Sequence, residues 1–339
     1  MVDIKERETY EATGTPRRLV HHNFMVSNAA RSIDFYNQVV GFEETFRVPD
    51  INAGFLSNGN THHDLAFSEV SERTRERTEK IRALGHTEVP ADWGAKPGLH
   101  HFAYEMFNEA ELVAAYDRLV EFEVKPWLMD DRVVTRSVYF SDPEGHGIEY
   151  TVDMLSNWRD YRKPGIKLQH TDYVPGQEPP RTETFVNMDP EVRRVEGAAL
   201  HPKRSAHSMI VARDFTRMRR FYIDAVGLRE MFLAPNGDFS VLHGKDFPGY
   251  SFVLAAESPN RPAGVHHISF EMVSADEIKG AEKALAAHGV QVEYKIEHPK
   301  KQVVCFRDPD GVLVQCFYEE PDFLDALGDM EPALALLLV

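Results

Sequence analysis

The sequence predicts an α+β protein with two domains, each built from a pair of βαβββ modules. Three observations lead to this prediction. The length of 339 residues suits two domains of moderate size. Segments that alternate apolar and polar residues, as strands do, precede segments with the apolar spacing of amphipathic helices. Both patterns recur in the second half of the chain, which indicates an internal repeat.

The first unit of each half has the same design. Residues 18–43 read as an alternating strand, a short turn and an amphipathic helix that ends at Gly41, and residues 204–230 repeat this order. His21 lies fifteen positions before Tyr36, and His207 lies fifteen positions before Tyr222. The two halves therefore align by counting alone.

The second unit of each half also repeats. GLHHFAYEM (98–106) leads to a predicted helix over 109–122 and ends with RSVYFSDPEGHGIEYT (136–151), two strands joined by a tight turn. GVHHISFEM (264–272) leads to a helix over 275–288 and ends with residues 303–320. One constant shift relates the chemically interesting positions His101, Tyr139 and Glu149 to His267, Cys305 and Gln315.

These units predict the domain organisation. We expect an N-terminal domain over 1–155, a linker over 156–202, a C-terminal domain over 203–320 and a helical tail over 321–339. The linker is rich in proline, and its aromatic residues Trp158, Tyr161, Tyr173 and Phe185 predict that it wraps the surface with those side chains buried. Residues 71–97 predict an exposed helix and a loop near the site.

Composition limits the partners. The net charge of −16 argues against nucleic acid, whose binding proteins present a basic face. We expect a cytoplasmic protein with no membrane partner, because the N-terminus lacks the apolar run of a signal peptide and the apolar run 333–339 is too short for a bilayer. The apolar segment 331–339 is expected to dock either on its own body or on another copy of the chain. We expect a homo-oligomer, which docking on another copy would form.

Strand alternation points to a metal site. In the first strand the apolar side chains must face the helix, which turns His21 to the concave side, and the same alternation turns His101 and Glu149 there. Two imidazoles and one carboxylate from three strands form the facial triad typical of iron sites, which leaves positions open for substrate and dioxygen. By this alternation His22, His62, His100 and His266 face away and are structural.

Each of these residues also has an ordinary explanation. A single strand histidine is more often a hydrogen-bonded core residue than a ligand, and DPEG is a good turn sequence without any function. The carboxylate of Glu149 is less easily explained, since its apolar neighbours make its burial costly unless a positive group compensates it. The joint placement in a repeat favours the metal.

The units resemble the vicinal oxygen chelate superfamily, and their pairing is similar to the two-domain, type I extradiol ring-cleaving dioxygenases over residues 16–155 and 203–320. The resemblance implies that each pair of modules forms a curved, incomplete β-barrel around a concave site. It implies the metal ligands His21, His101 and Glu149, the acid/base His63 in NTHHDLAF (60–67), and a hydrogen-bonding Tyr139. It also implies Fe(II), with Mn(II) as the alternative, and a small aromatic diol with O2 as substrates.

The resemblance has two departures. The C-terminal half has Gln315, Cys305 and Phe252 where the family has Glu, Tyr and the acid/base His, so we expect the metal in the N-terminal domain. His207 and His267 are then vestigial, or they form a second metal site with the amide oxygen of Gln315. A further family His before the Tyr is missing, and Arg132, Thr135 and Arg136 are the candidates to replace it.

Two other functions fit the same fold. A glyoxalase-type lyase or isomerase would use the metal as a Lewis acid without oxygen, and oxygen uptake separates it from a dioxygenase. A non-catalytic protein that binds an aromatic ligand in its concave sheets would hold no iron or manganese, so metal content separates it from both enzymes.

Overall fold

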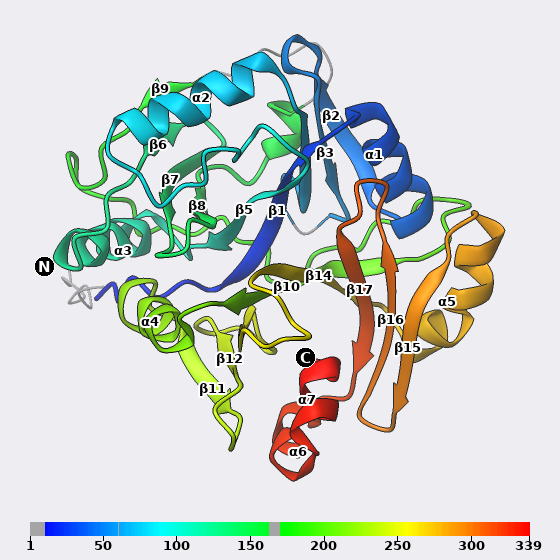
Figure 1. Ribbon diagram of the computed structural model, residues 1–339. Coiled ribbons are helices and arrows are strands. Elements are labelled where there is room, and N and C mark those ends of the chain that lie inside the picture. The colour runs from blue at the N-terminus through cyan, green and yellow to red at the C-terminus, as the bar shows by residue number, and fades with distance from the viewer. Residues whose placement is uncertain (1–10, 60, 163–169) are drawn as a thin grey trace, which may run out of the picture.

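The computed structural model describes residues 11–59, 61–162 and 170–339. Its strands form two large sheets with helices packed against them, and neither sheet closes into a barrel (Figure 1). The α+β prediction is confirmed. The first sheet contains β1 (Arg18–Val26), β2 (Glu43–Val48), β3 (Ala53–Ser57), β4 (Leu65–Glu69), β5 (Gly98–Glu105), β6 (Leu128–Asp131), β7 (Thr135–Ser141), β8 (Gly147–Asp153) and β9 (Thr171–Asp172). The second contains β10 (Pro202–Ala212), β11 (Arg229–Leu233), β12 (Phe239–His243), β13 (Phe252–Ala256), β14 (Gly264–Met272), β15 (Val292–His298), β16 (Lys301–Arg307) and β17 (Leu313–Glu319).

The strand order shows the internal repeat. It runs β2-β3-β4-β1-β5-β8-β7-β6-β9 in the first sheet and β11-β12-β13-β10-β14-β17-β16-β15 in the second. In both, an antiparallel seam, β1 with β5 or β10 with β14, joins two units of four strands, and β9 extends the second unit of the first sheet. The strands that carry the predicted metal ligands, β1, β5 and β8, are therefore neighbours.

The helices follow the expected order. The first unit of each half has a short helix that continues into a π-helical turn, Tyr36–Val40 or Phe221–Ala225, and Gly41 ends the first with a φ of 96°, which favours glycine. Across the described residues, none of the helices combines the length and apolarity that crossing a bilayer requires. The helices are α1 (Ala29–Phe35), α2 (Glu72–Ala83), α3 (Glu109–Glu121), α4 (Phe215–Arg220), α5 (Ala275–Ala287), α6 (Phe323–Ala326) and α7 (Pro332–Leu338).

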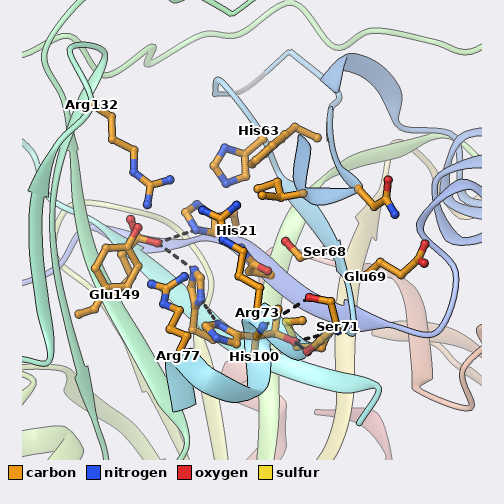
Figure 2. Close-up of a pocket in the computed structure, with 18 of the residues that line it drawn as sticks. His21, His63, Ser68, Glu69, Ser71, Arg73, Arg77, His100, Arg132 and Glu149 are labelled. Atoms are coloured by element: carbon orange, nitrogen blue, oxygen red, sulfur yellow. Dashed lines mark hydrogen bonds and ion pairs between the residues drawn. The ribbon is translucent and has the colours of Figure 1, made fainter. Parts of the chain in front are cut away.

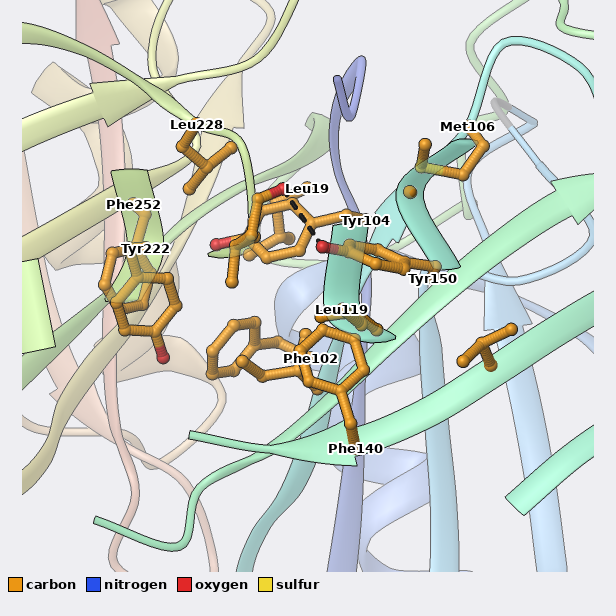
Figure 3. Packing of buried hydrophobic residues seen from close by; sticks show 14 of the residues in the cluster. Leu19, Phe102, Tyr104, Met106, Leu119, Phe140, Tyr150, Tyr222, Leu228 and Phe252 are labelled. Atoms are coloured by element: carbon orange, nitrogen blue, oxygen red, sulfur yellow. Dashed lines mark hydrogen bonds between the residues drawn. The ribbon is translucent and has the colours of Figure 1, made fainter. Parts of the chain in front are cut away.

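Helix faces join the two sheets. One apolar cluster combines residues of α1 with residues of α5, and another combines α3 with α4. Figure 1 shows both pairs at the level where the sheets meet. In the cluster of α3 and α4, Phe102 and Tyr104 of the first sheet pack near Tyr222 of the second π-helical turn and Phe252 of the second sheet (Figure 3). The Tyr150 hydroxyl donates to the Val226 carbonyl. Burial of these large side chains fixes the helix-covered faces, so chemistry is left to the opposite faces.

The linker only partly follows the prediction. Tyr173 is buried and donates its hydroxyl to Glu109, but Tyr161 is exposed, and Trp158 and Phe185 are half-buried. The expectation that all four aromatic side chains are buried is therefore wrong. Backbone hydrogen bonds also hold the segment on the surface; the Ala110 N–H, for example, donates to the Arg181 carbonyl. The domain boundaries themselves stay a prediction.

The C-terminal tail packs on its own chain. Side chains of α6 and α7, including Phe323 and Leu338, join an apolar cluster with strands of the second sheet. Leu338 and Val339 are fully buried there. The tail therefore docks on its own sheet, one of the two expected partners, and covers the face that corresponds to the concave face of the first half.

Candidate metal centre and cavity

Three adjacent strands bring His21, His101 and Glu149 together. In the sheet register Ala103 of β5 pairs with His21 on one side and with Glu149 on the other, which places the three side chains on the same face. The Nε2 atoms of His21 and His101 lie 2.9 Å and 3.0 Å from the same carboxylate oxygen of Glu149 (Figure 2). The three ligand atoms lie within 4.8 Å of one another, and all three residues are buried.

The charges of this group fit a divalent cation. Burial lowers the pKa of His101 to about 4, so its ring is neutral at pH 7. Burial opposes ionisation of Glu149, but the two histidines outweigh it and hold the pKa of that carboxyl well below its usual range. A buried carboxylate that faces two imidazole nitrogens is a donor set for a hard or borderline metal ion, without the thiolates that select zinc or copper(I).

His63 lies beside this group. Its ring centre is 4.2 Å from that of His21 and 4.3 Å from that of His62. Burial holds the pKa of His63 well below its usual range, and its Nδ1 has no hydrogen-bond partner within the described part of the chain. The side chain is thus a neutral base with one free nitrogen in a closed environment.

Tyr139 faces the group from β7. It pairs with Glu149 across the strands, and its ring stands nearly perpendicular to that of His101 at 5.4 Å. Burial raises the pKa of Tyr139 well above its usual range, so the phenol keeps its proton and is a hydrogen-bond donor. All five residues predicted from the sequence therefore line one cavity of roughly 400 Å³.

The insertion between β4 and β5 forms one wall of the cavity. The helix α2 lies against the cavity, in agreement with the helix expected near the site. The lining residues are the N-cap Ser71 and, from α2 itself, Arg73, Thr74, Arg77 and Thr78. Trp93 in the following loop stacks on His100 with ring centres 3.9 Å apart. The sequence does show Arg73 and Arg77 four residues apart, the spacing that puts two side chains on one helix face, but their orientation depended on where α2 docks.

Two of the four histidines expected to face away instead line the cavity. The expectation is wrong for His62 and His100. His62 precedes β4 in a turn, where strand alternation does not apply. At His100 a β-bulge shifts the register, since Asn23 pairs with His101 but Phe24 pairs with Leu99, and the extra residue points to the cavity side.

Two side chains from the expected set, His22 and Arg136, point away from the cavity. His22 does face the other side, where its Nε2 lies 2.8 Å from the Ser208 hydroxyl of the second sheet. Arg132 and Thr135 line the cavity, whereas Arg136 forms ion pairs with Glu109 and Asp131 outside it. Of the three candidates to replace the missing family histidine, Arg132 and Thr135 therefore remain.

The corresponding face of the C-terminal half is filled. The Ser269 hydroxyl lies 2.8 Å from His207 Nε2 and donates to Gln315 Oε1 at 3.0 Å. The ammonium group of Lys301 is buried nearby and donates to the Tyr250 hydroxyl. A buried cation and a hydroxyl that already occupies two of the ligand atoms both oppose a metal ion here.

One residue of the repeat was assigned wrongly. His22 pairs with Leu65 and Ser208 pairs with Phe252, so the counterpart of His63 is Tyr250 and not Phe252. The Tyr250 ring lies 4.4 Å from that of His207, which reproduces the arrangement of His63 and His21. Phe252 belongs to the apolar cluster between the sheets.

Comparisons with known proteins agree with this architecture. Residues 18–150 and 204–316 match the model of the family described as the glyoxalase/bleomycin resistance protein/dioxygenase superfamily. Biphenyl-2,3-diol 1,2-dioxygenase 3 of Rhodococcus globerulus is 25% identical over 167 residues, 49% of this chain and 74% of that protein. Catechol-2,3-dioxygenase of Bacillus subtilis is 26% identical over 147 residues, 43% of this chain and only 45% of that protein.

A solved structure shares the fold over nearly the whole chain. The 2,3-dioxygenase LapB of Pseudomonas sp. KL28 superimposes with a TM-score of 0.63 at 16% identity, covering 91% of this chain and 93% of that one. The likeness at this identity concerns the arrangement of both halves.

Proposed function

The chain belongs to the glyoxalase/bleomycin resistance protein/dioxygenase superfamily, and within it we propose that the chain is an extradiol dioxygenase. It would open a catechol-like ring with O2 at a metal held by His21, His101 and Glu149 in the N-terminal half. Fe(II) is the first candidate ion and Mn(II) the second, because both accept two imidazoles and a carboxylate. The names of the two relatives agree with this class of reaction.

One observation carries the proposal. A neutral base, His63, and a protonated phenol, Tyr139, share a cavity with a three-residue donor set that contains a single carboxylate. Lewis-acid chemistry alone gives no reason for both groups to be present. Ring opening needs a group that takes a proton from the diol and returns one to the product side, and a donor that holds a developing oxygen charge.

The residues divide this work. A divalent ion held by His21, His101 and Glu149 would supply Lewis acidity to the diol oxygens and would activate O2. An imidazole nitrogen of His63 accepts a hydroxyl proton and later returns it. Tyr139 O–H donates to an oxygen of the reacting ring. The carbon–carbon bond next to the diol breaks, and both atoms of O2 enter the product, giving a muconic semialdehyde-type acid and aldehyde.

The cavity walls assist by excluding water. Burial of the His21, His101 and Glu149 side chains, each about 5% exposed or less, limits solvent access to the reacting atoms. His100 Nδ1 lies 2.8 Å from His101 Nδ1, so it can accept a hydrogen bond from a proton on His101 Nδ1. With its proton on Nδ1, His101 has an unprotonated Nε2 for the metal.

An oxygen electrode with anaerobically prepared, Fe(II)-loaded protein and a catechol panel tests the proposal. We expect oxygen uptake with formation of a yellow semialdehyde. His63→Ala should keep the metal and lose at least about 100-fold in turnover, as general base catalysis contributes, whereas Glu149→Ala should lose the metal. Metal-replete His63→Ala with full activity contradicts the role of His63.

The same experiment addresses the glyoxalase-type alternative. That reaction consumes no oxygen, so metal-loaded wild-type protein without oxygen uptake on any diol of the panel favours it. A protein purified from iron- and manganese-supplemented cells without either metal favours a non-catalytic aromatic-binding protein instead.

A further inference from the structure

The cavity carries more positive charge than the proposed chemistry uses. Four arginines line it, Arg73 and Arg77 from α2, Arg132 from the loop between β6 and β7, and Arg162 from the segment after β8. Figure 2 shows Arg73, Arg77 and Arg132 extending into the pocket from its walls. None of the four belongs to the donor set or to the acid/base pair, so their presence needs a separate explanation.

The two arginines of α2 lie at the rim without an acidic partner in the described chain. Arg73 and Arg77 are exposed. The guanidinium carbon of Arg77 lies 5.7 Å from the centre of the Trp127 ring, which is a cation–π contact and not an ion pair. Arg75 on the outer face of the same helix instead pairs with Glu72 at 3.6 Å. The cavity-facing side of α2 thus presents two guanidinium groups that form no ion pair with a carboxylate among the described residues.

Arg162 is the buried member of the set. Only 6% of it is exposed, and its Nε has no hydrogen-bond partner within the described residues. Its guanidinium lies over the Phe46 ring at 5.6 Å, and one Nη donates weakly to the Arg132 carbonyl at 3.5 Å. Burial lowers the pKa of Arg162 to about 10, so the group remains charged at pH 7 and bears a desolvation cost that an anion would offset.

The acids on the cavity wall do not balance this charge. Glu149 belongs to the donor set, and Glu69 accepts the backbone N–H of Ala29 at the start of α1. Asp130 pairs with Arg132 at 2.8 Å, which leaves Arg73, Arg77 and Arg162. Asp50 lines the rim and is exposed.

We infer that the diol substrate carries a carboxylate on its ring substituent, which Arg162 and the α2 arginines Arg73 and Arg77 bind. This rests on the proposed function and names its substrate class. The fork of donors on a guanidinium matches the two oxygens of a carboxylate, and the cavity of roughly 400 Å³ holds one aromatic ring with a short acidic side chain. The rim arginines also attract an anion before it enters.

A pair of ligands that differ only in charge tests the inference. The probes are 3,4-dihydroxyphenylacetate and its methyl ester, titrated calorimetrically into anaerobic, Fe(II)-loaded protein, so that no turnover occurs. We expect the acid to bind at least about tenfold more tightly than the ester, as one charge-assisted contact provides. The preference should shrink with added salt, because the rim charges are exposed.

Variants assign the preference to residues. Arg77→Gln and Arg162→Met should each reduce the ratio of ester to acid dissociation constants about tenfold, the effect of one lost charge-assisted contact. Arg75→Gln on the outer face of α2 is the matched control and should keep the wild-type ratio. Should Arg162→Met not fold, the exposed Arg77 still provides the comparison.

The outcomes separate the two proposals. Equal binding of acid and ester by the wild-type protein overturns the carboxylate inference, even where oxygen uptake on catechols supports ring cleavage. A preference that Arg77→Gln and Arg75→Gln both retain in full overturns the assignment to α2. Acid-selective binding without oxygen uptake on any diol rejects ring cleavage and leaves the anion site in place.

Discussion

One hydroxyl group distinguishes the residue at the centre of the filled site from its counterpart in the open site. Ala103 and Ser269 occupy the same register position, each between a histidine strand and the strand of the third residue. In the C-terminal half the Ser269 hydroxyl occupies Nε2 of His207 and the amide oxygen of Gln315. We predict that Ala103→Ser places a hydroxyl between His21 and Glu149 in the same way and weakens metal binding.

The size of this effect follows from the contacts. A metal ion must displace two hydrogen bonds of the new hydroxyl, each worth about 0.5 to 1.5 kcal/mol. Together they amount to about 1 to 3 kcal/mol, which corresponds to roughly 5- to 150-fold in the metal dissociation constant. Neither ligand is removed, so the variant should bind metal at high concentration and recover its activity there.

Competition against a chromophoric chelator under anaerobic conditions measures the dissociation constants for Fe(II) and Mn(II). Ala103→Gly changes the same position without adding a hydroxyl and should bind metal within about threefold of the wild type, since it adds no hydrogen bond to displace. Ser269→Ala is the converse control in the other half and should change nothing. A folded Ala103→Ser protein with wild-type metal affinity would refute the reasoning.

Three shorter predictions concern the surroundings of the cavity. Burial raises the pKa of Asp64 from 3.8 to about 6. The contribution of this carboxyl to the free energy of unfolding is therefore full below pH 3.8 and is lost as pH rises through 6. Urea unfolding at pH 3.8 and at pH 8 should show that Asp64→Asn stabilises the protein by at most about 3 kcal/mol at pH 8. His100→Phe keeps an aromatic ring against Trp93 but removes the contact to His101, and should weaken metal binding about 10- to 100-fold in the chelator assay. Mass spectrometry of metal content should give one equivalent per chain, and two equivalents would show that the C-terminal half also binds.

Local sequence rules predicted much of this site. Strand alternation gave the orientation of His21, His101 and Glu149, because regular strands with one apolar face have only two possible orientations and a slip would bury the wrong set. The same rule failed at His62, which precedes its strand, and at His100, where the bulge inserts one residue. A bulge depends on how two distant strands pair, and nothing in either strand alone announces it.

Counting along the repeat had a related limit. The shift between halves is constant within each second unit, so Tyr139 and Cys305 aligned correctly and now occupy equivalent places in β7 and β16. In the first units the loop before β13 is one residue longer than the loop before β4, so the shift that relates His21 to His207 takes His63 to Gly249, and neither this count nor the assignment to Phe252 finds Tyr250. Loop lengths vary without cost to the sheets, so only the pairing with β1 and β10 fixes this residue.

The filled half explains why the open half can be chemical. Thr135 lines the cavity, and its counterpart Lys301 reaches across the same space to Tyr250 and to Glu319 at 3.1 Å. Lys301, Tyr250 and the tail helices thus fill in the C-terminal half the space that stays open in the N-terminal half, where Arg162 Nε has no hydrogen-bond partner within the described residues. If this space served only stability, the N-terminal half could be filled by side chains in the same way as the C-terminal half. Leaving buried charges around an open cavity is costly, and binding a cation at one end and an anion at the other would offset both parts of that cost.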